Sequence, residues 1–211
     1  MIGLKWSEEA REFAEKSANT CIKGHSAGED RQSDMFGPCG ENLFFSWSSG
    51  QYKYTWFDAI EAWHSEKKDF TYGSKDYEFM AIGHYTAVMW ASTSHIGCAY
   101  KNCDTPLEKR KPNWVQNKFA CIYCTSGNYL DKIHMPYKRG KPCTDCPNDC
   151  FKSLCLNKCP LKNKLPEKYC KKDTGILFKK NKKGCNDVNV REKCPSTCDC
   201  SDRPYIQRWS Q

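Results

Sequence analysis

Two stretches in the first third of the chain repeat apolar residues with the spacing of an amphipathic helix. In the first, residues 6–21, Ser7 stands where a helix N-cap is expected, and two glutamates follow it near the positive end of the helix. The apolar face of this helix consists of Ala10, Phe13, Ala14 and Ala18. The second stretch, residues 54–70, predicts another helix. Its apolar positions at helical spacing are Trp56, Ile60 and Trp63.

Two further stretches, residues 40–47 and 118–124, are rich in aromatic and β-branched residues and predict strands. Residues 83–90 have an apolar pattern that fits either a strand or a short helix. The first part of the chain is therefore predicted to be a domain of mixed α and β structure.

The composition is that of a folded protein, with 39% hydrophobic and 27% charged residues among 211. This length suits one large domain or two small ones. No apolar run approaches the ~18 residues of a transmembrane helix. Residues 1–4 lead directly into the first helix pattern, so no signal peptide is visible, and we expect a mature form or a fragment of a longer protein.

Sixteen cysteines are the most informative feature of the composition. Such a density indicates an oxidising compartment, where disulfides supplement a small core. A zinc site is the alternative, because Cys121-x2-Cys124 and Cys143-x2-Cys146 have the spacing of a four-cysteine zinc module. That site would leave twelve cysteines unexplained, so disulfides are favoured.

Cysteines and charges divide the chain at residues 136–143, a linker rich in Pro, Gly and Lys. The first 135 residues hold six cysteines and most of the tryptophans, whereas residues 136–200 hold ten cysteines and few large apolar groups. Cross-links must therefore stabilise much of the second part. From Cys159 onward, thirteen basic residues stand against six acidic ones, so this segment carries +7 of the net charge of +8.

The most basic stretch is residues 171–185, with six lysines and one acidic residue. Such charge runs are most often solvated surfaces, and they also bind anionic glycans or membranes without specificity. The alternative is a specific contact, in which lysines meet an acidic partner and apolar residues anchor it. The candidate contact residues are Lys171, Lys172, Ile176, Leu177, Phe178, Lys179, Lys180, Lys182 and Lys183.

Four polar residues stand at unusual places in the apolar pattern. They are His25 after the first predicted helix, Glu41 at the start of a strand, Glu66 at the edge of an apolar helix face, and His84 within residues 83–90. Each is either a boundary or surface residue, or one of a set that converges on a divalent cation, because imidazole and carboxylate groups are ordinary zinc ligands. The residues by themselves leave both interpretations open.

Five segments, in order along the chain, resemble the cysteine-rich secretory protein branch of the CAP superfamily. They are CGEN (39–42), AWHSEKKDF (62–70), GHYTAVMW (83–90), CIYCTSGNY (121–129) and HMPYKRGKPCTDCPNDC (134–150). The third and fourth segments resemble the two signatures of the superfamily. The resemblance extends over essentially the whole chain, which makes it specific.

The resemblance implies an α+β fold in three parts. An α-β-α sandwich, the CAP domain, is expected over residues 1–135, and a disulfide-rich hinge over residues 136–158. A small helical cysteine-rich module, similar to sea-anemone potassium-channel toxins, is expected over residues 159–211. Relatives begin about one helix upstream of the position of Leu4, so we expect either a fragment or a sandwich that exposes part of its sheet, at a cost of several kcal/mol at about 25 cal/mol per Å².

The same resemblance implies site residues and disulfides. His25, Glu41, Glu66 and His84 match the two His and two Glu of the CAP cleft, and in some members the two His bind zinc, so His25 and His84 are candidate zinc ligands. One small departure from the second signature is Cys-Thr-Ser at residues 124–126, where relatives commonly carry Cys-Pro-Ala. The implied disulfides are Cys21–Cys103, Cys39–Cys124, Cys98–Cys121, Cys143–Cys150, Cys146–Cys155, Cys159–Cys200, Cys170–Cys194 and Cys185–Cys198.

Three classes of function are compatible with this resemblance. An enzyme needs a nucleophile or an activated water, but paired cysteines supply no thiolate and no serine lies in a nucleophile-elbow motif, so we expect no catalysis. A carrier is the second class, because some CAP domains bind sterols or other lipids. The aromatic residues of the first part could line an apolar groove, although such residues more often form a core.

The third class, a ligand of ion channels, is the one we favour. Venom members of the family block or modulate calcium, potassium and cyclic-nucleotide-gated channels, which implies the extracellular face of a cation channel as the partner. We expect a secreted, monomeric, non-enzymatic toxin that acts through its basic C-terminal module. The alternative is a secreted protein of reproduction or defence that binds sterol, lipid or zinc. Anionic glycans and membrane surfaces are secondary partners, and no nucleic acid is expected.

Overall fold

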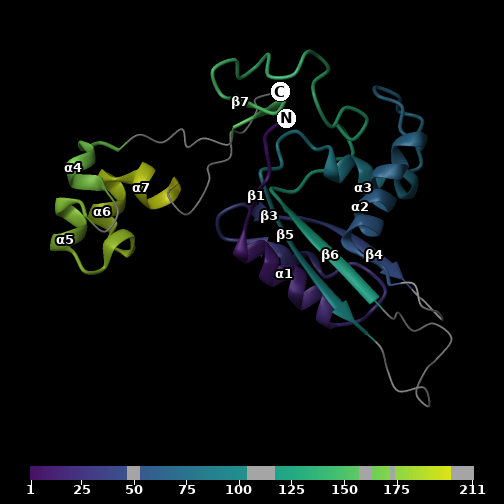
Figure 1. The fold of residues 1–211 in the computed structure, drawn as a ribbon, viewed down its shortest axis with the longest axis horizontal. Coiled ribbons are helices and arrows are strands. Elements are labelled where there is room, and N and C mark those ends of the chain that lie inside the picture. Colours follow the sequence, from purple (N-terminus) through teal and green to yellow (C-terminus); the bar gives the residue numbers. More distant parts are fainter. Residues whose placement is uncertain (47–52, 104–116, 157–162, 172–173, 201–211) are drawn as a thin grey trace.

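A four-stranded sheet forms the centre of the first part of the protein (Figure 1). The computed structural model describes residues 1–46, 53–103, 117–156, 163–171 and 174–200, except for the side chains of Ser196, Asp199 and Cys200. The strand order is β1 (Lys5–Trp6), β5 (His95–Asn102), β6 (Asn117–Cys124) and β4 (Gly40–Ser46). β1 runs parallel to β5, whereas β6 runs antiparallel to both of its neighbours.

The inner strand β6 is buried from Lys118 to Cys124, because both faces of the sheet are covered. Its side chains alternate between two hydrophobic clusters. Ala120 and Ile122 pack towards one face, and Phe119 and Tyr123 pack towards the other. This continuous burial explains why the sequence here reads as an unbroken apolar run rather than as an alternating one.

Helices cover the two faces in the manner of a sandwich. α1 (Glu8–Asn19) packs on one face, and α2 (Trp56–Ser65) packs on the other, with α3 (Phe79–Val88) beside it (Figure 1). A third cluster joins α3, through Ile82, to Trp90 and Ile133 in the loops that follow. The predicted α-β-α architecture is confirmed.

The predicted apolar face of α1 is confirmed. The Ser7 side chain accepts a hydrogen bond from the backbone N–H of Ala10 at 3.2 Å and so caps the helix. Three of the predicted apolar residues are buried and Phe13 is partly buried. The helix lies so close to β5 that a Cβ atom at Gly97 would overlap the backbone of Ala10 and Arg11.

The second helix is shorter than predicted and uses a different face. α2 ends at Ser65, and residues 66–69 form the 3-10 helix η2 (Glu66–Asp69). Trp63 is buried as expected, but Ile60 is 52% exposed, and Ala59 takes the core position one residue earlier. Helical spacing allows either residue, and the small side chain lets the helix approach the sheet more closely.

The remaining strands and helices agree with the sequence predictions in part. β4 and β6 confirm the two predicted strands, and α3 shows that the ambiguous residues 83–90 are largely helical. Strand β5 was not predicted. The shorter elements are η1 (Gly28–Arg31), β2 (Gln32–Ser33), β3 (Gly37–Pro38), β7 (Cys150–Phe151), β8 (Leu154–Cys155), α4 (Glu167–Cys170), α5 (Ile176–Lys180), η4 (Gly184–Asn186), α6 (Val188–Lys193) and α7 (Pro195–Cys200).

Disulfides cross-link all three parts of the chain. The structure contains Cys21–Cys103, Cys39–Cys124, Cys98–Cys121, Cys143–Cys150, Cys146–Cys155, Cys170–Cys194 and Cys185–Cys198. These are seven of the implied pairs, and the eighth, Cys159–Cys200, lies outside the described residues. The four cysteines of the alternative zinc module all take part in these disulfides with other partners, so that alternative is wrong.

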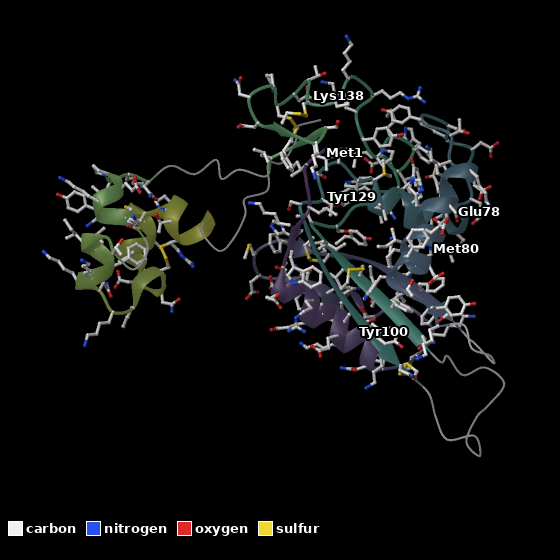
Figure 2. The ribbon with its side chains drawn as sticks, in the orientation of Figure 1. Met1, Glu78, Met80, Tyr100, Tyr129 and Lys138 are labelled. Atoms are coloured by element: carbon white, nitrogen blue, oxygen red, sulfur yellow. A yellow bond between two sulfur atoms is a disulfide. The ribbon has the colours of Figure 1, made fainter. Side chains whose placement is uncertain are left out.

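One face of the sheet is partly exposed to solvent at strands β1 and β5. Trp6 pairs with Ile96 in register, which directs it to the face covered by α2, yet it is 54% exposed. Tyr100 on the same face is 46% exposed, although its ring contacts Phe119 with centroids 4.7 Å apart (Figure 2). Apolar surface of the sheet is therefore in contact with solvent here.

Across the parts of the chain that the structure describes, no helix combines the length and hydropathy needed to cross a bilayer.

The close approach of α1 to β5 yields a prediction. Substitution Gly97→Ala should destabilise the fold by about 3 kcal/mol or more, because backbone on the helix cannot move aside as a side chain can. The matched control is Gly28→Ala, whose added Cβ meets no atom within 4 Å. Urea unfolding of the disulfide-intact proteins measures both. Equal stability of the two variants would contradict this packing.

Candidate functional site

The first site pair joins His25 to a buried carboxylate at the start of β4. Glu41 Oε2 lies 2.8 Å from His25 Nδ1, and the Glu41 side chain is fully buried while that of His25 is 55% exposed. Ser26 donates to the same carboxylate twice, from its backbone N–H at 2.9 Å and from its hydroxyl at 3.1 Å. The glutamate thus fixes the loop that follows α1.

The environment of Glu41 keeps it ionised. Burial raises the pKa of a carboxyl group, but the hydrogen bonds from His25 and Ser26 and the positive charge of Arg31 outweigh it and lower the pKa of Glu41 to about 2. Arg31 also donates to the backbone carbonyls of Ser26 and Cys39. The ionised carboxylate of Glu41 is therefore a buried negative charge that holds the loop after α1 at the start of β4.

The second pair lies between η2 and α3. Glu66 Oε1 is 2.6 Å from His84 Nδ1, and Glu66 Oε2 accepts hydrogen bonds from the backbone N–H groups of His84 and Tyr85 at 2.8 and 3.0 Å. The His84 ring stacks on Trp63 with centroids 6.5 Å apart. Glu66 is thus placed by the 3-10 turn that was not predicted from the sequence.

Consecutive residues of β4 connect the two pairs. Glu41 binds the loop of His25, and Asn42 Nδ2 donates to the backbone carbonyl of His84 at 3.1 Å. Because side chains alternate along a strand, these two contacts lie on opposite faces of β4. The residues that the sequence singled out are therefore neighbours around one edge strand.

The four residues form two His–Glu pairs rather than one cluster of four ligands. Among the described residues, no group of three or more His, Cys, Asp or Glu side chains is placed to hold a metal ion. Each glutamate contacts the Nδ1 atom of its own histidine, which leaves Nε2 of each imidazole as the available donor. Such a donor set fits an open site with two histidines and other ligands, and does not fit a closed site of four protein ligands.

A buried lysine supports the first pair, and sequence analysis missed it. Lys118 on β6 is 1% exposed, and its Nζ donates to the carbonyl of Ile22 at 3.1 Å and to the hydroxyl of Thr20 at 3.3 Å. Burial lowers its pKa, and the charge of Glu41 opposes that effect. A lysine in an apolar strand was the available signal, since lysine is rarely buried without partners.

The predicted contact residues of the C-terminal module differ in exposure. Lys171, Ile176, Lys179, Lys180, Lys182 and Lys183 are exposed, Leu177 and Phe178 are half-buried, and Lys172 lies outside the described residues. The Phe178 ring packs near Gly184, where an added Cβ would lie 3.7 Å from it. Phe178 therefore serves the interior of the module more than its surface.

An exposed apolar residue of this module was not predicted. Val188 on α6 is 73% exposed, whereas Val190, two residues later, is 2% exposed and forms part of the interior. The spacing of the two valines shows that they point in different directions on a helix, but it does not show which one is outside.

Several aromatic residues of the first part pack in its interior. Phe119 contacts Trp56 with ring centroids 5.0 Å apart and Phe44 with centroids 5.8 Å apart. Trp63 is buried and donates from its indole N–H to the backbone carbonyl of Leu43. These rings therefore act as core residues.

Comparison with known proteins places both parts of the chain. The family described as CAP, cysteine-rich secretory protein family, matches residues 1–127, and the family described as Crisp matches residues 143–205. Human cysteine-rich secretory protein 2 is 36% identical over 208 residues, which cover 97% of this chain and 76% of that protein. Human cysteine-rich secretory protein 3 is 33% identical over 206 residues, with the same coverage.

Solved structures agree with the fold. The structure described as BmVAL-1 has a TM-score of 0.58 and 28% identity and covers 74% of this chain and 77% of its own. The structure described as NaASP2 with Zn2+ has a TM-score of 0.54 and 26% identity and covers 74% of this chain and 76% of its own.

The buried Glu41 predicts a specific response to acid. Its pKa is lower in the folded than in the unfolded protein, so the folded state binds fewer protons, and the stabilisation is lost as the pH falls from about 4.5 towards 2. The loss amounts to about 3 kcal/mol at most. Substitution Glu41→Gln should remove this part of the pH dependence.

Urea unfolding midpoints at neutral pH and at pH values down to about 3 measure this effect. The matched control is Glu12→Gln on the exposed side of α1, which should follow the parent protein. The same acid response in Glu41→Gln as in the parent would show that the buried carboxylate is not its source.

Proposed function

Because the chain belongs to the cysteine-rich secretory protein family, we propose that it is a secreted, non-enzymatic protein whose C-terminal module binds the extracellular face of a cation channel and inhibits it. The observation that carries this proposal is the group of exposed lysines on and after α5. The first part of the protein would then serve as a stable carrier of that module.

The scaffold of the module supports the proposal. Its helices α4 to α7 are four to six residues long, and helices of this length are not stable by themselves. Cys170–Cys194 and Cys185–Cys198 join them, and three of these four cysteines are buried together with Val190. A cross-linked scaffold loses little conformational entropy on binding.

The charge of the module suits a cation channel. Lys179 and Lys180 end α5, and Lys182 and Lys183 follow it, all with exposed side chains. Within the described part of the chain these four lysines form no salt bridge, so their charge is directed to solvent. Acidic rings at the mouths of cation channels attract such a surface and increase the rate of encounter.

Apolar contacts would complete the interface. Ile176 at the start of α5 is 39% exposed, and Val188 at the start of α6 is 73% exposed. Exposed aliphatic residues beside lysines can be desolvated on binding and so slow dissociation. We therefore propose Val188, and not the half-buried Phe178, as the second apolar anchor beside Ile176.

The structure also bears on catalysis. All the cysteines it describes are in disulfides, so none of them offers a thiolate nucleophile. The residues of the His–Glu pairs are held by hydrogen bonds to backbone and to each other. This arrangement supports a structural or ligand-holding role more than turnover.

Charge reversal tests the proposed surface. The double variant Lys179→Glu, Lys180→Glu should weaken block of voltage-gated potassium or smooth-muscle calcium currents about tenfold or more, because both charges change sign at the contact. Patch-clamp titration with the full chain measures the half-blocking concentration.

The matched control is Lys67→Glu, Lys68→Glu, an exposed lysine pair in η2 of the first part that gives the same change in net charge. Block that is unchanged in the α5 variant, or reduced equally in both variants, would show that Lys179 and Lys180 do not contact the channel.

Zinc binding is a second candidate function, supported by the similar structure described with Zn2+. His25 and His84 would hold the ion through their Nε2 atoms, with Glu41 and Glu66 orienting the rings through Nδ1. When bound, the ion would link the loop after α1 to α3. The partial exposure of both histidines leaves them accessible.

Calorimetric titration with zinc tests this second candidate. His25→Ala and His84→Ala should each lower the zinc affinity at least tenfold. His64→Ala, which removes an exposed histidine from α2, is the control and should leave the affinity unchanged. Equal affinities in all four proteins would exclude this site.

A further inference from the structure

The start of the chain and the hinge form a small sheet of their own. β7 and β8 make a hairpin whose turn residues, Lys152 and Ser153, both have positive φ angles of 48° and 70°. Ile2 adds a parallel bridge to Cys155, with hydrogen bonds from Gly3 N–H to the Cys155 carbonyl and from Cys155 N–H to the Met1 carbonyl. We call this unit the hinge sheet.

The register of the hinge sheet separates two faces. Ile2 and Cys155 are partners and share one face, and both are 5% exposed. Their neighbours along each strand point to the opposite face. The exposed apolar side chains on that opposite face are those of Met1 at 39%, Phe151 at 60%, Leu154 at 37% and Leu156 at 46%. The half-buried Asp149 lies beside them, because its carbonyl accepts a hydrogen bond from the Leu156 N–H at 2.7 Å.

Gly3 lies beside the hairpin. A Cβ atom there would be 3.9 Å from the Cβ of Leu154, an ordinary van der Waals distance, so the Leu154 side chain lies beside the backbone of Gly3. Disulfides Cys143–Cys150 and Cys146–Cys155 hold the hairpin from its other side. The exposed face is therefore a fixed surface of the described chain.

Residues 136–156 carry a net positive charge, and one of their lysines lies beside the apolar face. The Lys152 ammonium lies 5.5 Å from the centroid of the Phe151 ring, and within the described residues it forms no salt bridge. Four basic residues and two acidic ones occur in residues 136–156. Met1 and Lys138 lie at the end of the sandwich that carries β7 (Figure 2). Lys138 is paired with Asp145 at 2.9 Å, and Arg139 lies 4.4 Å from the centroid of the Tyr72 ring, so Lys152 is the basic residue that these contacts place beside the face.

We propose that the hinge sheet is a membrane-binding surface, which inserts Phe151 and Leu154 into the interfacial layer of a bilayer containing anionic phospholipids. An aromatic ring with a lysine over it suits this layer, because the ring enters the acyl boundary while the ammonium stays among the phosphates. Lipid needs no matching pocket, which suits an apolar face at a hairpin turn. The net positive charge of residues 136–156, with Lys152 beside the ring, has the sign that anionic lipids attract.

Membrane binding by the hinge sheet is separate from the proposed channel binding and does not depend on it. A surface of this kind would hold the protein at the plane in which membrane proteins lie. The test uses vesicles without any protein, so its outcome is independent of the proposed channel contact.

Vesicle flotation tests the proposal with the full, disulfide-intact chain. The parent protein should float with vesicles of phosphatidylcholine containing about 30% phosphatidylserine. Phe151→Ser should weaken this binding about tenfold, because burial of its ring is lost. Phe57→Ser, which removes a phenylalanine of α2 that is 72% exposed, should bind as the parent does.

A second variant tests the charge and does not alter the apolar face. Lys152→Glu should weaken binding to the phosphatidylserine vesicles about tenfold and leave weak binding to pure phosphatidylcholine unchanged. Failure of the parent to float, or equal flotation of Phe151→Ser and parent, would overturn the proposal. Retention on heparin by the same residues without flotation would assign the surface to glycans, and would also overturn it.

Discussion

Disulfide bonds are the constraint on which the arrangement of this protein depends, and they act differently in its two parts. In the sandwich, Cys98–Cys121 joins β5 to β6, Cys39–Cys124 joins the residue before β4 to the end of β6, and Cys21–Cys103 joins the loop after α1 to the residue that follows β5. These disulfides surround an existing hydrophobic core. In the C-terminal module the helices are too short to be stable alone, and the buried residues there are largely the half-cystines themselves. The module can therefore expose apolar side chains that a small fold without disulfides would need for its interior. It can expose its charged side chains as well.

The edge strand β4 shows how a few polar groups organise the end of the sandwich. Glu41 is buried, ionised and hydrogen-bonded to the loop after α1, while its neighbour Asn42 holds α3 through the His84 carbonyl. Lys118 fixes the other end of the same loop. These interactions place two imidazole rings around one strand without bringing their glutamates together. Each histidine contacts its glutamate through Nδ1 and keeps Nε2 available.

Sequence reasoning succeeded where local pattern and family resemblance agreed. The face of α1, the strands β4 and β6 and the sandwich itself followed from spacing or from the signatures. It was less successful where tertiary packing decides, as at Ile60, which lies outside because Ala59 lets α2 approach the sheet. It missed β5, Lys118 and Val188, whose positions depend on partners distant in sequence. The formation of two separate His–Glu pairs on either side of β4 likewise required the fold.

The central claim about function is that electrostatic attraction draws the C-terminal module to a cation channel. The lysines of α5 support this claim, because they are exposed, form no salt bridge in the described structure and are held on a rigid scaffold. The most direct measurement is the ionic-strength dependence of the rates of channel block and recovery, recorded on outside-out patches with sucrose replacing salt. The account predicts an association rate that falls steeply as salt rises, with little change in the dissociation rate. An association rate that does not depend on salt would contradict it.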